Sequence, residues 1–236
     1  MPEITSIFKR TEKKYLITRR QKEELTAEMQ GRMIPDEFGR STVCSIYFDT
    51  PDYRYIRASI EKPVYKEKLR MRCYGRPNEN SRVFIELKKK FKGVVYKRRE
   101  TLTLSQAKDY VERGVMPCDT QIMREIDYLY RLGEGLRPAV LIMCEREAFF
   151  ASDDRDFRVT FDGSLRFRTT DVFPDGSLEG EPIVDSDLFV MEVKSAGGMP
   201  LWLSGVLDEM KLYPVSFSKY GRVYTDHISR KEYTYA

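Results

Sequence analysis

The sequence has little of what most nucleophilic and transition-metal chemistry requires. His227 is the only histidine among 236 residues, and the four cysteines are far apart and form no C-x-x-C pair. Ser-His-Asp triads, Cys-His pairs and multi-histidine metal sites are therefore nearly excluded, unless His227 serves alone. A disulfide framework or structural zinc site is equally unexpected, which favours a reducing compartment. Cys73 and Cys144 are predicted to be small buried residues rather than nucleophiles.

Long apolar runs and glycine-rich phosphate loops are missing as well. No run approaches the roughly 18 apolar residues of a membrane helix, and the N-terminus lacks an apolar signal core. These absences predict a soluble, cytoplasmic protein. The net charge is only +4, from 41 basic and 37 acidic residues. That balance is too even to predict a nucleic-acid partner, so we expect none.

What the sequence does contain is a series of strands with one apolar and one cationic face. Side chains two residues apart share a face of a strand. In residues 68–73 every second side chain is Lys or Arg, and the side chains between them are apolar. Residues 83–90 show a similar alternation of apolar and charged side chains. An Asn-rich turn joins the two stretches, as in a hairpin. The cations on such faces are Arg10, Lys14, Lys68, Arg70, Arg72, Lys88, Lys90, Lys97, Arg99, Arg146, Arg158 and Lys194.

The pattern along the chain predicts an α+β fold in one domain spanning residues 1–236. Expected strands cover residues 8–17, 42–48, 64–75, 83–90, 94–104, 139–148, 157–162 and 188–194. Expected helices cover residues 18–29, 53–62, 105–113, 120–132 and 201–211, with Thr18 and Ser105 as N-caps. Residues 170–186 and 216–221 are expected to be loops, and His227 a surface residue. Many antiparallel strands favour a closed barrel or a sandwich, because closure removes exposed edges. In a barrel, helices would cover the apolar outer faces and the charged faces would line the lumen.

A cationic lumen needs water and a polyanion, because burying unpaired charge is costly. Arg and Lys suit phosphate oxygens, and carboxylates on the same faces suit Mg²⁺ or Mn²⁺. One Glu-x-Lys motif is weak evidence, since solvated strands also carry it, but three copies together with Arg70-x-Arg72 favour a phosphate-chain site. The copies are Glu12/Lys14, Glu86/Lys88 and Glu192/Lys194, with Asp162 as a further carboxylate.

These motifs resemble the triphosphate tunnel metalloenzymes of the CYTH-like superfamily. Within that superfamily the sequence is similar to the catalytic domain of the vacuolar transporter chaperone (VTC) polyphosphate polymerases, in a bacterial stand-alone form. The resemblance extends from residues 10–15 to residues 218–220. The motifs between them are Tyr47-Phe-Asp49, Arg70-Met-Arg72, Glu86-Leu-Lys88, Arg146-Glu-Ala-Phe149 and Met191-Glu-Val-Lys194.

The resemblance implies a closed antiparallel β-barrel of about eight strands with a charged lumen, flanked by helices. It also implies a nucleoside triphosphate donor such as ATP, a polyphosphate product, and Mn²⁺ or Mg²⁺ on the phosphates. The predicted catalytic cations are Arg70, Arg72, Lys88, Arg146 and Lys194. Further predicted phosphate contacts are Lys14, Lys97, Arg158, Ser218, Lys219 and Tyr220, to which the charged faces add Arg10 and Lys90. Glu192 matches the metal-binding carboxylate, and Glu12 and Glu86 are the additional candidate metal ligands.

The sequence also departs from the family pattern and leaves alternatives open. Cys144 stands where the family often has a tyrosine. The phosphate-sensing SPX domain and the membrane segments of eukaryotic members are missing, so a membrane-protein partner at the inner face of the membrane would have to come from another chain. Hydrolysis of triphosphate substrates in the same tunnel is the main alternative to polymerisation. A non-catalytic polyphosphate-binding module and an ordinary sandwich with solvated charged faces are the others.

Overall fold

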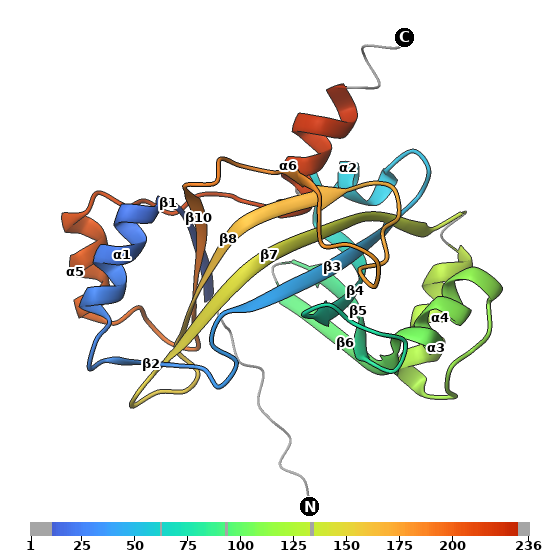
Figure 1. Cartoon of the computed structure of the whole chain (residues 1–236), viewed down its shortest axis with the longest axis horizontal. Helices are drawn as coiled ribbons and strands as arrows, with labels where there is room; N and C mark the ends of the chain where they lie inside the picture. Colours follow the sequence, from blue (N-terminus) through green and yellow to red (C-terminus); the bar gives the residue numbers. More distant parts are fainter. Residues whose placement is uncertain (1–10, 62, 93, 133–134, 231–236) are drawn as a thin grey trace, which may run out of the picture. The chain divides into compact units, whose positions relative to one another are not determined.

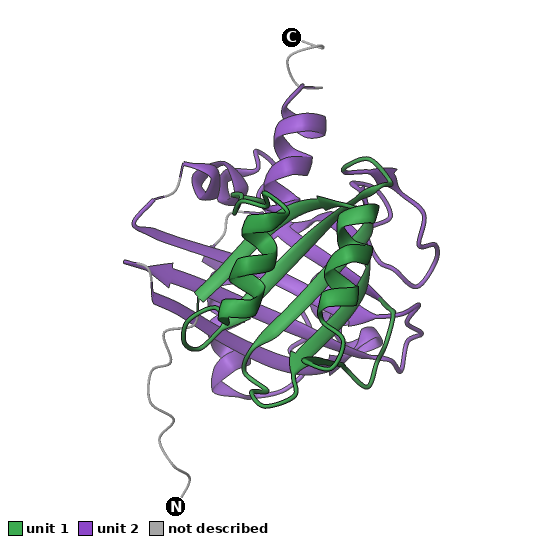
Figure 2. Ribbon diagram, turned by 90° about the vertical axis from the view of Figure 1, so that its left-hand side faces the viewer, with its two compact units in different colours: residues 1–41, 145–164, 184–217 green, residues 42–144, 165–183, 218–236 purple. Residues whose placement is uncertain are grey.

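The computed structural model describes residues 11–61, 63–92, 94–132 and 135–230. Within them it is an α+β protein whose strands pair antiparallel, with six α-helices (Figure 1). The chain divides into two compact units (Figure 2): unit 1 comprises residues 1–41, 145–164 and 184–217, and unit 2 comprises residues 42–144, 165–183 and 218–236. Each unit is therefore assembled from segments far apart in the sequence.

Unit 1 is a small antiparallel sheet covered on one face by two helices. β1 (Thr11–Thr18) pairs with β10 (Leu188–Ser195), which pairs with β8 (Arg158–Arg168), and β2 (Met33–Pro35) pairs with the end of β7 (Arg137–Ala151). Figure 2 shows α1 (Arg19–Glu28) and α5 (Leu201–Glu209) lying across these strands. The apolar core between them contains Tyr15, Ile17, Leu25, Val159, Phe161, Met191, Val193, Leu203 and Leu207.

Unit 2 contains the meander β3 (Ser41–Asp49), β4 (Tyr65–Tyr74), β5 (Arg82–Phe91) and β6 (Val94–Thr103). Its apolar face is covered by α3 (Leu104–Arg113) and α4 (Gln121–Leu132). The shorter elements are α2 (Arg54–Ile60), β9 (Glu181–Pro182), α6 (Lys219–Val223) and the π-helical turn η1 (Tyr224–Ile228). The core includes Cys44, Ile46, Phe48, Leu69, Met71, Ile85, Leu87, Leu104, Ala107, Met123 and Ile126.

The predicted strands and helices are present wherever the structure describes the chain, and the apolar faces lie beneath helices as expected. Residues 8–10, Arg10 included, lie outside the described residues. Cys73 and Cys144 are buried free thiols, as predicted. In the described part of the chain, no helix is long and apolar enough to cross a membrane.

Several local predictions were wrong. β2 and β9 were missed, because strands of two or three residues are too short to show alternation. The segment 216–221 is not all loop: α6 begins at Lys219 and is likewise too short to show a helical period. His227, expected to be a surface residue, is half-buried within η1, where its ring centroid is 4.6 Å from that of Phe167.

The closed barrel is the largest correction. Across the described residues the hydrogen-bonded order runs β1-β10-β8-β7-β3-β4-β5-β6, and no ladder joins β6 back to β1. Alternation of apolar and polar residues indicates that a strand has two different faces. It does not indicate whether the last strand of a sheet pairs with the first.

The helix cap at α3 generates a direct test of the local structure. The Thr103 hydroxyl accepts from the Gln106 N–H at 3.2 Å, and the Gln106 side chain accepts from the Thr103 N–H at 2.9 Å, which forms a capping box. Thr103→Ala should therefore lower the free energy of unfolding by about 1 kcal/mol, as measured by urea denaturation. Ser105→Ala, at the position that the sequence suggested for the cap, should change it by less than about 0.5 kcal/mol. Equal losses in the two variants would contradict this assignment.

Candidate functional site

Strand register places three lysines side by side on the polar face of unit 2. Lys68 of β4 lies opposite Lys88 of β5, which lies opposite Lys97 of β6. Like charges directly opposite each other destabilise an antiparallel sheet. In this lysine row (Lys68, Lys88 and Lys97), repulsion between the ammonium groups lowers the stability of the sheet, and an anion bound on the same face would offset that repulsion.

Two residues further along the same face, a buried carboxylate gathers three cations. Glu86 is 1% exposed and lies between Arg70 of β4 and Arg99 of β6 in the register. Its carboxylate accepts from Arg70 Nε at 3.1 Å, Arg99 Nε at 2.8 Å and Lys97 Nζ at 2.6 Å. Burial alone would raise the pKa of Glu86, but Arg70 and Lys97 hold that pKa well below its usual range. In this arrangement Glu86 is the buried counter-ion of three cations. Its role as a metal ligand stays a prediction.

Tyr47 of β3 is a member of this face that sequence reasoning did not select. It lies opposite Arg70, whose guanidinium carbon is 5.9 Å from the centre of the Tyr47 ring. Burial alone would raise the pKa of the Tyr47 phenol, but the charges of Arg70, Lys68, Arg72 and Lys219 lower it to about 8. Tyr47 lies between two apolar residues, at positions 46 and 48, so the alternation of side chains along the strand could have placed it on the polar face.

Asp49, at the end of β3, ties three elements of unit 2 together. This fully buried carboxylate accepts from the backbone N–H groups of Thr50 at 2.9 Å, Tyr55 at 2.8 Å and Ile56 at 3.0 Å. It also accepts from the Tyr220 hydroxyl of α6 at 2.9 Å. Burial and the Asp49 carboxylate raise the pKa of Tyr220, which keeps its hydroxyl protonated as a donor. Tyr220 therefore holds α6 in place, and its role as a phosphate contact stays a prediction.

The start of α6 places the neighbouring predicted residues. Ser218 is the N-cap, and its hydroxyl oxygen accepts from the Gly221 N–H at 3.1 Å. The Tyr220 ring stacks on Tyr47 with centroids 5.0 Å apart and planes 30° apart. Lys219, which lies between Ser218 and Tyr220 in the sequence, is close enough to lower the pKa of Tyr47. The structure thus brings Lys219 to the cationic face of unit 2.

Unit 1 has a charged face of a different kind, in which the signs alternate. The register places Lys14 of β1 opposite Glu192 of β10, and Glu12 opposite Lys194. Lys14 Nζ is 3.4 Å from both Glu12 Oε1 and Glu192 Oε1, and Lys194 Nζ is 3.0 Å from Glu192 Oε2. Arg158 of β8 follows Lys194 in the same row.

Arg146 is held by a bidentate ion pair within unit 1. Its Nε and one terminal nitrogen each donate to Asp162 at 2.6 Å, and Asp162 is fully buried. Two parallel hydrogen bonds fix the plane of a guanidinium as well as its position. The sequence indicated Asp162 as a carboxylate on a charged face but not as the partner of Arg146.

The remaining predicted residues lie on the face of unit 2 that carries the lysine row. Arg72 lies opposite Ser45 and Phe84, and Lys90 lies opposite Lys66.

The carboxylates of unit 1 fit a hard divalent cation that takes its other ligands from a substrate. The described part of the chain has no cluster of three or more His, Cys, Asp or Glu residues that could enclose a metal. Thr160, opposite Glu192, has a buried hydroxyl oxygen with no hydrogen-bond partner among the described residues. Mg²⁺ commonly binds through one or two carboxylates and completes its shell with waters and phosphates. Glu192 and Glu12, with the Thr160 hydroxyl, match that donor set.

The depressed pKa of Tyr47 predicts a pH-dependent gain in stability. The folded protein releases the phenol proton near pH 8, whereas the unfolded chain keeps it until about pH 10. The wild type should therefore gain stability relative to Tyr47→Phe as the pH rises through this window and lose that gain as the pH falls below 8. Ultraviolet difference titration should show one phenolate appearing early, absent from Tyr47→Phe and retained in a Tyr213→Phe control. An early phenolate that persists in Tyr47→Phe would contradict the assignment.

Comparison with known proteins agrees with this geometry. The sequence matches the VTC domain family over residues 9–225. A comparison with curated proteins finds no match.

A solved structure from Bacillus halodurans shows the same kind of fold. A candidate adenylate cyclase from Bacillus halodurans superposes with a TM-score of 0.54 and 15% identity, covering 93% of this chain and 95% of that one. A candidate adenylate cyclase from Vibrio parahaemolyticus has a TM-score of 0.48 and 11% identity, covering 91% and 97%. At these identities the likeness is one of fold. The family match spans nearly the whole chain, and this chain belongs to the VTC domain family.

Proposed function

We propose that this protein is a polyphosphate polymerase, which transfers the γ-phosphoryl group of a nucleoside triphosphate, ATP first among them, to a growing phosphate chain. The observation that carries the proposal is the row formed by Lys68, Lys88 and Lys97 beside Arg70. A phosphate chain has negative charge on every repeat, so it can neutralise several adjacent cations at once. Membership of the VTC domain family supports triphosphate chemistry at this face.

The proposed reaction requires positioning and charge neutralisation rather than a covalent enzyme intermediate. A terminal oxygen of the acceptor chain attacks the γ-phosphorus, and the bond between that phosphorus and the β–γ bridging oxygen breaks. The products are a chain longer by one phosphate and a nucleoside diphosphate. In unit 2, Arg70, Arg72 and Lys88 would neutralise charge on the transferred and leaving groups. Arg146 and Lys194 of unit 1 are included as catalytic cations because the family resemblance implies them.

In this proposal Glu192 and Glu12 hold Mn²⁺ or Mg²⁺ together with the Thr160 hydroxyl. The bound cation would neutralise charge on phosphate oxygens. Lys14, Lys97, Arg158, Lys90 and Lys219 would bind further phosphates. A membrane-protein partner from another chain also belongs to the proposal.

Hydrolysis of the triphosphate is a second candidate function, and one observation favours it. A general base is most effective when its pKa lies near the working pH. The Tyr47 phenol, with a pKa of about 8, meets that condition on the cationic face. The phenolate could accept a proton from a water molecule that attacks the γ-phosphorus. Water would then be the attacking group in place of an oxygen of a phosphate chain.

One experiment separates the candidate functions. Purified protein is incubated with ATP and Mn²⁺, and the products are examined on a polyphosphate gel beside a free-phosphate assay. A polymer ladder supports the polymerase. Free phosphate without polymer supports the hydrolase, and no turnover with saturable tripolyphosphate binding supports a binding module.

Lys88→Ala should lower polymer synthesis at least about 100-fold, because it removes a cation from the centre of the lysine row. Lys89→Ala is the matched control, since Lys89 lies next to it on the opposite face of β5, beside residues of α4. Arg70→Ala is a less clean test, because it also removes a partner of the buried Glu86. Equal activity in the Lys88 and Lys89 variants would overturn the assignment.

Glu192→Gln should weaken the response to metal more than the binding of nucleotide. In a Mn²⁺ titration of the activity, we expect the half-maximal concentration to rise about tenfold or more, as for the loss of a metal-orienting group. Glu24→Gln, on the exposed side of α1, is the control and should leave the titration unchanged. A wild-type metal response in Glu192→Gln would remove this residue from the proposed metal ligands.

A further inference from the structure

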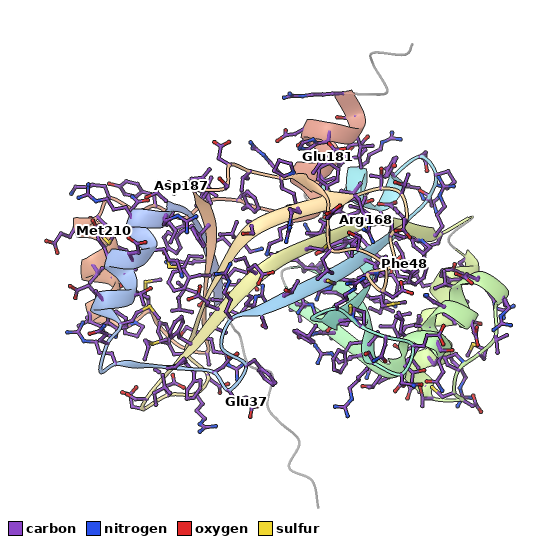
Figure 3. All side chains as sticks on the ribbon, viewed as in Figure 1. Glu37, Phe48, Arg168, Glu181, Asp187 and Met210 are labelled. Atoms are coloured by element: carbon purple, nitrogen blue, oxygen red, sulfur yellow. The ribbon has the colours of Figure 1, made fainter. Side chains whose placement is uncertain are left out.

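Unit 2 contains a cationic cavity that none of the residues of the lysine row lines. The cavity has a volume of about 320 Å³ and lies between the β4–β5 turn and the segment of residues 169–180 that follows β8. It is lined by Arg76, Arg166, Gly176, Ser177, Leu178 and Glu179. Arg168 and Glu181, which are labelled in Figure 3, flank the two ends of the segment.

The cavity belongs to the opposite face of the sheet from the lysine row. Val172, Phe173 and Leu178 of the segment pack against the apolar cluster that contains Met71 and Leu87. Those two residues alternate along their strands with the cations of the candidate site, so they face the other way. A ligand in this cavity would therefore not be bound by the lysine row.

The walls of the cavity are held by interactions at several points of the segment. Arg76 donates to the Gly176 carbonyl, and Lys108 of α3 donates to Asp175. Arg168 donates to the carbonyls of Phe173 at 2.8 Å and Glu179 at 3.5 Å. The cavity is thus shaped by the protein itself, without a ligand to order it.

Arg166 is the residue that lacks a partner. It makes no hydrogen bond or ion pair with any described residue, and its Nε atom is buried. It lies opposite Pro182 of β9, which has no N–H of its own. A partly buried guanidinium without a counter-ion is costly, and a cavity beside it offers room for one.

The other polar groups suit a phosphoryl group. The Ser177 hydroxyl oxygen accepts from the Glu179 N–H at 3.0 Å, so its proton remains to be donated to a ligand. Arg76 and Arg166 present two guanidinium groups, which match phosphate oxygens in planar, paired geometry. The Glu179 carboxylate would repel an anion, but with the two guanidinium groups the charged side chains that line the cavity still carry a net positive charge.

We propose that this cavity is a second anion site that binds a phosphoryl group between Arg76, Arg166 and Ser177. The group can come from orthophosphate or from the end of a phosphate chain, and both present the same terminal oxygens. The site is independent of the proposed polymerase reaction, because none of its residues belongs to the candidate functional site.

Hydrogen–deuterium exchange with tripolyphosphate as the probe tests this site directly. We expect tripolyphosphate to slow the exchange of residues 169–180 in the wild type and in Lys88→Ala. In Arg166→Gln the concentration needed for that protection should rise at least about tenfold, since a charge-assisted contact is lost. Arg137→Gln, which alters an exposed arginine of the same unit, should behave as the wild type. No protection of this segment in the wild type, or unchanged protection in Arg166→Gln, would overturn the proposal.

Glu179→Gln tests the sign of the interaction. It removes the opposing carboxylate, so it should lower the concentration of tripolyphosphate needed for half protection. An unchanged or higher concentration would contradict an anion site. Protection by orthophosphate as well would identify a single phosphoryl group as the ligand, and protection by tripolyphosphate alone would identify the chain end. Because the readout is exchange in residues 169–180, failure here leaves the polymerase test at Lys88 unaffected.

Discussion

The carboxylate of Glu86 is the interaction on which the cationic face of unit 2 depends. It is buried between Arg70 and Arg99 and also bonds Lys97, so it neutralises part of a charge density that the sheet could not otherwise hold. One carboxylate cannot balance three cations. Lys68 and Lys88 lie opposite each other in the adjacent row, so the cations of this face lie close together, as a polyanion site requires.

Asp49 gives this face its second support. Through one fully buried carboxylate it fixes the start of α2 and, by way of Tyr220, the position of α6. Tyr220 in turn stacks on Tyr47, which lies opposite Arg70. The C-terminal helix is thus part of the site, and the acidity of the Tyr47 phenol reports how strongly the surrounding cations act.

The two units hold charge in different ways. In unit 1 the signs alternate along Lys14, Glu192 and Lys194, and Arg146 is matched by the buried Asp162. In unit 2 the cations adjoin one another. In the proposed function, the carboxylates of the first arrangement hold a metal ion and the cations of the second bind phosphates. The two parts of the proposed chemistry therefore correspond to two different local arrangements.

The sequence by itself determined which side chains share a face. The period of two along β4 and β5 places Arg70 and Lys88 on the polar side and Met71 and Leu87 beneath helices, because alternation is a local property of a strand. Family membership also followed from the order and spacing of short motifs.

Only the tertiary structure decided which residues on that face meet. The register that joins Lys68, Lys88 and Lys97, and that sets Tyr47 against Arg70, arises from hydrogen bonds between strands and leaves no local pattern. The same holds for Tyr220 and Asp49, which are 171 residues apart in the sequence. Sheet closure and the cavity at Arg166 likewise depend on contacts between distant segments, so alternation within one strand could not predict them.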